Sequence, residues 1–147
     1  MSTLLSQPTY DDVNLLLRLY ELRREQKMRA ARWWFVSKFK CKTMEEFGKL
    51  CPPGSEANAS FRQFTSYWEM AASFVNSGVL NSELFFANCR EMLVCWVRMK
   101  PLIAEMRAAF GDSSLMANVE KAGDAYADWL IKNGGADAYA SFVKRVG

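Results

Sequence analysis

Residues 61–75 read FRQFTSYWEMAASFV, and their large apolar side chains recur every three or four positions, which is the spacing of an α-helix. At 100° per residue, the polar side chains of this region fall on an arc about 100° wide, and apolar side chains fill roughly 200° on the other side. A helix with so wide an apolar side packs against two neighbours, which predicts a central place in a helical domain. The apolar side chains are Phe61, Phe64, Tyr67, Trp68, Ala71, Ala72, Phe74 and Val75.

Helical spacing continues on both sides of this segment, and no stretch alternates between apolar and polar residues as a strand would. The predicted fold class is all-α: one helical domain over residues 1–147, an antiparallel bundle of four main helices plus two short ones, with residues 1–9 irregular. The predicted helices span residues 10–39, 44–50, 57–77, from 81 or 82 to 110, from the caps at 112–114 to 132 or 133, and 137–146.

The composition excludes several classes of protein. Half of the 147 residues are hydrophobic, which is enough for a substantial core and excludes a disordered chain. The chain has no histidine, so Ser-His and Cys-His nucleophile pairs and His-containing zinc or haem sites are excluded. It also lacks a glycine-rich phosphate loop and a G-x-S-x-G motif. We favour a protein without enzymatic activity, and we expect no metal and no cofactor.

The cysteines and the first residues predict a compartment. No two of the four cysteines form a C-x2-C pair, and thiols in a chain with a large core are typical of a reducing cytoplasm. The first 12 residues lack the basic and apolar regions of a signal peptide. The longest strongly apolar run, residues 92–97, is far shorter than the roughly 20 residues that cross a membrane. We therefore expect a cytoplasmic protein with no membrane contact.

Positive charge is concentrated near the start of the chain. Nine basic and two acidic residues lie between Arg18 and Lys42, a net charge of +7 in a protein whose total is +3. Arg18, Arg29 and Arg32 form a basic face that would lie along phosphates. No aromatic residue is expected between these arginines, so nucleic-acid binding is only the third functional hypothesis.

The predicted helix 10–39 has apolar residues on two sides. The main stripe, which we expect in the core, consists of Val13, Leu16, Leu17, Tyr20, Met28, Ala31, Trp34, Phe35 and Phe39. A second set lies on the opposite side, where a monomer needs no apolar residue, and it predicts a homodimer interface. The leading hypothesis is therefore a non-enzymatic interaction module that self-associates through this helix. The second set is Leu15, Leu19, Leu22 and Trp33.

Arg24 falls in the middle of the main stripe, where an apolar residue is expected. A buried guanidinium needs an acidic partner or an anionic ligand, unless its stem packs and its head reaches the surface. The alternative functional hypothesis is therefore a small-molecule binder, in which Arg24 holds an anionic head. The apolar body of the ligand would lie against Trp34, Trp68 and Trp96.

Carboxylates elsewhere are expected to be structural. Glu91, Arg98 and Glu105 recur every seven residues and predict an exposed, ion-paired face. Glu69 lies beside Tyr67 and Trp68 in sequence, but its neighbours on the helix surface are polar, which favours a solvated or ion-paired carboxylate.

Three segments resemble a family of known sequences: YELRREQKMRAARWWF at residues 20–35, WEMAASFVNSGVLNSELFF at 68–86 and REMLVCWVRMKPLI at 90–103. Together they are similar to a bacterial family of small all-helical domains of unknown function, over residues 15–130. The resemblance implies a helical fold and implies no activity, cofactor or catalytic residue.

Overall fold

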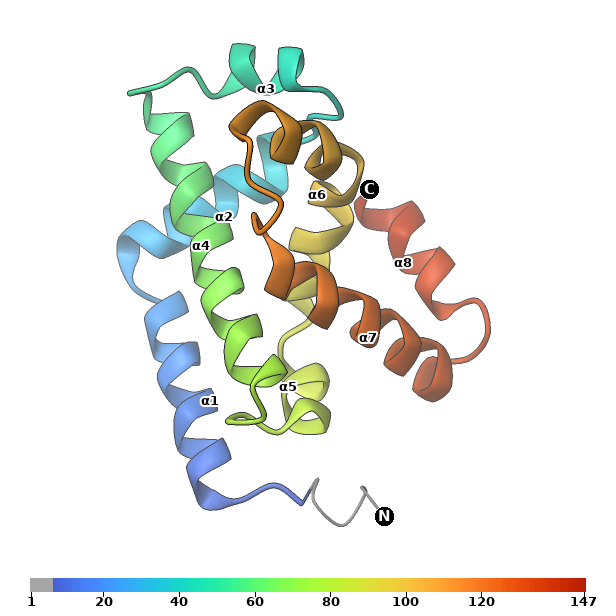
Figure 1. Cartoon of the computed structure of the whole chain (residues 1–147). Helices are drawn as coiled ribbons and strands as arrows, with labels where there is room; N and C mark the ends of the chain where they lie inside the picture. The colour runs from blue at the N-terminus through green and yellow to red at the C-terminus, as the bar shows by residue number, and fades with distance from the viewer. Residues whose placement is uncertain (1–6) are drawn as a thin grey trace.

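The computed structural model describes residues 7–147, which form eight α-helices and no strand (Figure 1). The all-α class is confirmed, but two of the predicted long helices are each divided in two. Of the segment 1–9, residues 1–6 lie outside the described residues, and 7–9 precede the first helix without regular structure. The helices are α1 (Tyr10–Arg23), α2 (Gln26–Lys38), α3 (Met44–Leu50), α4 (Glu56–Asn76), α5 (Ser82–Asn88), α6 (Arg90–Phe110), α7 (Ala117–Gly134) and α8 (Ala138–Val146).

The continuous helix predicted over residues 10–39 is wrong, because the chain turns at Arg24 and Glu25 between α1 and α2. The Glu25 carboxylate accepts hydrogen bonds from the backbone N–H groups of Lys27 (3.1 Å) and Met28 (3.3 Å). These bonds satisfy amides that have no partner within a new helix and so fix the start of α2. The turn also changes the direction of the chain, so α1 and α2 present independent faces.

The second division falls at Cys89, between α5 and α6. Cys89 has φ −126° and ψ 57°, outside the helical region, although nothing in its side chain signals a break. Pro101, the residue that most disfavours a helix in this region, lies inside α6, which continues on both sides of it.

Helix α4 packs against both α2 and α7, which confirms the two neighbours predicted for residues 61–75 (Figure 1). Stacked aromatic rings join α2 to α4. The ring centroids of Phe35 and Phe64 lie 4.1 Å apart, and those of Phe35 and Phe39 lie 4.7 Å apart. All three side chains are fully buried, so the inner side of α2 belongs to the core.

Helices α6 and α7 approach each other closely where Gly123 lies on Trp96. A Cβ atom at position 123 would lie 2.4 Å from Cδ1 of Trp96, well inside van der Waals contact. Trp96 is held in place because its indole N–H donates to the Asp124 carboxylate at 3.1 Å. Glycine at 123 therefore sets the separation of the two helices.

Arg98 is buried, so the exposed, ion-paired face predicted for Glu91, Arg98 and Glu105 is wrong at Arg98, although Glu91 does form an ion pair, with Arg32, and Glu105 is exposed. The Arg98 guanidinium donates to the carbonyl oxygens of Phe39 (2.6 Å), Val36 (3.1 Å), Phe35 (3.2 Å) and Val146. The carbonyls of Val36, Phe39 and Val146 stand at the ends of α2 and α8, where the helix itself supplies no donor, whereas the Phe35 carbonyl also accepts from the N–H of Phe39. Arg98 thus joins the end of α2 and the end of α8 to α6, and burial lowers its pKa.

Glu69 of α4 supports the start of α7 rather than pairing with a cation. Its carboxylate accepts hydrogen bonds from the backbone N–H groups of Asn118 (3.1 Å) and Val119 (2.9 Å) and from the Asn118 side chain (3.0 Å). Negative charge is favourable at a helix N-terminus. Met116, the residue before α7, has φ 58° and forms no side-chain cap, so the capping group comes from another helix.

Candidate functional site

The outer surfaces of α1 and α2 form the candidate site. The N-terminus of α1 is held in place by two sets of hydrogen bonds. Thr9 and Asp12 form a capping box, in which the Thr9 N–H donates to the Asp12 carboxylate at 2.8 Å. The other carboxylate oxygen accepts from the N–H of Asn81, also at 2.8 Å, which ties α1 to the start of α5. The backbone hydrogen bonds from Asn81 and Thr9 lower the pKa of Asp12.

The inner face of α1 rests on the core through Leu19, which is 2% exposed, with Leu15 and Leu16 half-buried beside it. The hydroxyl of Tyr67 on α4 donates to the carbonyl of Leu19. Burial raises the pKa of Tyr67, so this hydroxyl stays protonated and remains a donor. These contacts bind one face of α1 to the rest of the domain.

The outer face of α1 is apolar and exposed. Tyr10 is 90% exposed, Leu17 is 55% exposed, and Val13 and Tyr20 are each more than 40% exposed. The sequence predicts Val13, Leu17 and Tyr20 in the core and Leu19 outside it, and the structure reverses both placements. The reason is the turn at residues 24–25. A helical wheel drawn through one continuous helix assumes that α1 and α2 share one rotational phase, whereas the turn lets α1 face the core with a different side.

Arg24 lies at the turn and is exposed, so its predicted place inside a buried stripe is wrong. Its guanidinium carbon is 5.6 Å from the ring centroid of Tyr20, and that of Arg23 is 5.4 Å from the same centroid. Two cations therefore lie near one exposed tyrosine ring.

The three tryptophans that were assigned with Arg24 to a ligand pocket belong to the core or its edge. Trp68 and Trp96 are fully buried, and Trp34 is half-buried near the rings of Phe35 and Phe39. Arg24 lies outside the core that contains Trp68 and Trp96, so the four residues do not form one pocket. Of the residues assigned to an interface, Leu22 and Trp33 are exposed.

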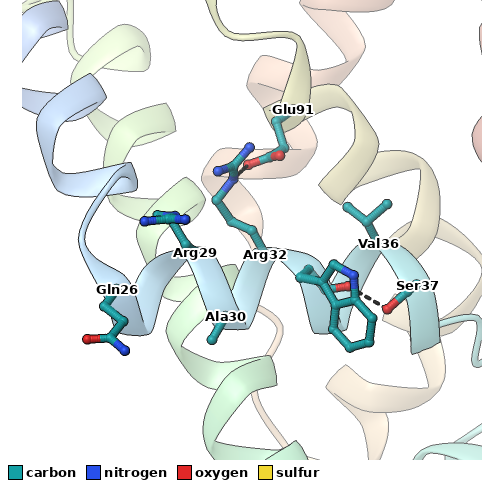
Figure 2. A pocket seen from close by; sticks show the side chains of 8 residues that line it. Gln26, Arg29, Ala30, Arg32, Val36, Ser37 and Glu91 are labelled. Atoms are coloured by element: carbon teal, nitrogen blue, oxygen red, sulfur yellow. Dashed lines mark hydrogen bonds and ion pairs between the residues drawn. The ribbon is translucent and has the colours of Figure 1, made fainter.

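A groove of about 910 Å³ runs along the outer side of α2 (Figure 2). Arg29 and Arg32 leave α2 on the same side, and Arg32 reaches Glu91 of α6. The Arg32 Nε donates to the Glu91 carboxylate at 2.7 Å, and this hydrogen bond raises the pKa of Arg32. The groove is lined by Gln26, Arg29, Ala30, Arg32, Trp33, Val36, Ser37 and Glu91.

Trp33 stands out in this groove because its side chain is 65% exposed. The Ser37 hydroxyl donates to the Trp33 carbonyl at 2.6 Å, and the Lys38 ammonium lies 5.8 Å from the centroid of the Trp33 ring. Arg18, the third residue of the predicted basic face, is exposed on α1, outside the residues that line the groove.

The four cysteines are buried and free. Burial raises the pKa of Cys51 and of Cys89 to about 11, so both thiols stay protonated at neutral pH and are poor nucleophiles. Within residues 7–147, no three Cys, Asp or Glu side chains gather as metal ligands would. In the same part of the chain, no helix is both long and apolar enough to cross a membrane.

The comparison with protein families identifies the domain. The family model described as "Domain of unknown function (DUF4760)" matches residues 8–125, most of the chain. The protein belongs to this family. The predicted resemblance to a family of domains of unknown function is thereby confirmed. No curated protein and no solved structure matches the chain.

The DUF4760 match begins two residues before α1 and ends within α7, so it includes the exposed face of α1 and the groove on α2. Sequence reasoning missed Tyr10 as a surface residue of interest, and it missed that Trp33 lies beside Arg29 and Arg32. The spacing of residues 10, 13, 17 and 20 was a usable signal, because it repeats the 3–4–3 pattern of a helix-pairing seam.

Proposed function

We propose that this domain is a helical interaction module that pairs with a second copy of itself through the outer face of α1. The observation that carries the proposal is the outer stripe: the four exposed apolar side chains Tyr10, Val13, Leu17 and Tyr20. Their spacing is that of a coiled-coil seam, in which apolar side chains recur every 3.5 residues on average. The core is closed without them.

A second copy of the chain is the partner that fits the outer stripe, because the stripe has the same pattern when it is read from either end of α1. Its order is aromatic, aliphatic, aliphatic, aromatic, and its spacing is three, four and three residues. An antiparallel pair of α1 helices related by a two-fold axis places Tyr10 against Tyr20 of the second copy. The same axis places Val13 against Leu17, so a single stripe provides both sides of the interface.

The surroundings of α1 also favour pairing. Leu17 and Tyr20 border a groove of about 280 Å³ between α1 and the end of α5, where side chains of a second copy would enter. Four side chains per subunit form a small interface, so we expect a dissociation constant in the micromolar range.

Sedimentation equilibrium over roughly 1–200 µM protein tests this function. We expect a dimer in the wild type and a monomer in Leu17→Glu, with the same circular dichroism spectrum, because a charge in the seam cannot be buried without a partner. Ile131→Glu is the matched control, since Ile131 is an exposed aliphatic residue on α7 and its replacement should leave the dimer intact. A wild type that is monomeric throughout would overturn the proposal.

Cysteine cross-linking tests the antiparallel order. The native thiols are buried, so an added cysteine on the outer stripe is the accessible one. A mixture of Val13→Cys and Leu17→Cys proteins should form a disulfide-linked dimer, and each variant alone should form much less of it. Equal cross-linking by each variant alone would contradict the antiparallel pair.

A further inference from the structure

A track of unpaired positive charge follows α2 and the segment after it. Five exposed cations lie between residues 27 and 42, and none of them forms a salt bridge within the part of the chain that the structure describes. On α2, Arg29 lies on the groove side, whereas Lys27 and Lys38 start from the other side of the helix, about 160–180° away at 100° per residue, and the Lys38 ammonium lies 5.8 Å from the centroid of the Trp33 ring. The five are Lys27, Arg29, Lys38, Lys40 and Lys42.

Three carboxylates in this region, one of which (Glu91) lines the groove, already accept hydrogen bonds. Glu25 accepts from the first amides of α2, Glu46 accepts from the backbone N–H of Lys42 at 2.7 Å, and Glu91 pairs with Arg32. Among the residues that the structure describes, none of the five cations is held in a salt bridge, so they are available to an external anion, and Arg29 and Lys38 near Trp33 fit a ligand with repeated charges.

Trp33 adds an aromatic surface within the same track. Its exposed ring lies in the groove with Arg29 and Arg32, and the Lys38 ammonium is near it. The sequence predicts that no aromatic residue lies among these arginines, and that absence was the objection to a stacked base. The structure removes the objection.

We propose that the α2 groove binds single-stranded nucleic acid, with one base stacked on Trp33 and the phosphates held by Arg29, Lys38 and the lysines that follow. Grooves of positive charge with an exposed aromatic ring are how proteins hold single strands without reading their sequence. A strand carries one negative charge per nucleotide, which suits the cations Arg29 and Lys38 beside the Trp33 ring. The proposal does not depend on pairing through α1.

Fluorescence anisotropy with a labelled 12-nucleotide oligo(dT) tests it. Neutralising about four phosphates should make the affinity fall about 50-fold between 50 and 200 mM salt. Trp33→Ala should weaken binding about tenfold, because a stacked base is lost. Phe110→Ala, which removes an exposed aromatic ring from the far end of α6, is the matched control and should bind as the wild type does.

The salt dependence tests the cations separately. Arg29→Gln combined with Lys38→Gln should reduce the slope of log K against log salt by about 1.4, whereas Lys121→Gln with Lys132→Gln on α7 should leave it unchanged. The proposal is overturned by no binding at 50 mM salt, or by Trp33→Ala binding as tightly as wild type. Tighter binding of duplex DNA, or equal competition by a 12-residue polyglutamate, would also overturn it.

Discussion

The N-terminal pair α1–α2 and the assembly of α4, α6 and α7 use the same kinds of residue in different ways. In the assembly, Trp68 and Trp96 are fully buried, and Gly123 lets α7 lie directly on the Trp96 ring. In the pair, Tyr10 and Trp33 are mostly exposed, although one side of each helix enters the core. The difference teaches that apolar residues beyond those needed to close the core are concentrated on α1 and α2, which is where we place binding.

The polar groups differ in the same way. Glu69 joins α4 to α7 within the assembly, and Arg98 joins α6 to the ends of α2 and α8, so both bind backbone groups of other helices. Around α2, only Arg32 has an ion-pair partner among the cations of the described residues 26–42, and the others face solvent. If the comparison is right, substitutions in the assembly reduce stability, and substitutions on the outer faces of α1 and α2 reduce binding alone.

Arg98→Met should have the largest effect on stability. Methionine fills similar space but leaves the carbonyls of Phe39, Val36 and Val146 without their donor, which we expect to cost about 3 kcal/mol of unfolding free energy. Urea denaturation followed by circular dichroism measures this loss. Lys100 lies two residues after Arg98 on α6 and is exposed, so Lys100→Met should change stability by less than about 0.5 kcal/mol. Equal losses in the two variants would break the comparison.

Gly123→Ala should be the next largest. The added methyl group meets the Trp96 ring, and moving α7 away from α6 to admit it should cost about 2 kcal/mol. Gly48→Ala is the control because a Cβ at position 48 of α3 meets no atom within 4 Å. Alanine favours a helix over glycine, so this control should be slightly more stable than wild type. The same denaturation measurement ranks the two variants.

Asp12→Asn should have a smaller effect that depends on pH. The carboxylate has a lowered pKa in the folded protein, so it contributes stability above its unfolded pKa, and that contribution is lost as the pH falls through the folded pKa. We expect the variant to be about 1 kcal/mol less stable at pH 7. The difference between variant and wild type should shrink below about pH 4. A difference that stays constant from pH 7 to pH 3 would show that the charge contributes nothing.

The sequence predicted the helical class, the central position of residues 61–75 and the short helix at 44–50. These follow from local spacing and from caps such as Thr43, which do not depend on the rest of the fold. The division at Glu25 was within reach, because an acidic residue before a new helical turn is a capping signal. The division at Cys89 was harder to predict, since Asn88 is the one turn-forming residue beside it and no proline or glycine marks the break.

The candidate sites were harder to predict because they depend on which side of a helix is covered. One missed turn at residues 24–25 exchanged the inner and outer faces of α1, which placed Leu19 outside and Leu17 inside. Arg98 shows a second reason. Its role depends on carbonyls of α2 and α8 that lie about 50 or more residues away in sequence, and no local pattern records such a partner.

The uneven burial of the tryptophans has a spectroscopic consequence. Trp68 and Trp96 sit in a dry core, while the indole of Trp33 is surrounded by water on the face where we place the ligand. A water-soluble quencher such as iodide will act first on Trp33, and the emission that survives will come mainly from the interior. Of the five tryptophans, Trp33 thus reports events on the surface of α2, Trp68 and Trp96 report the loss of the core, and the half-buried Trp34 and Trp129 contribute to both signals.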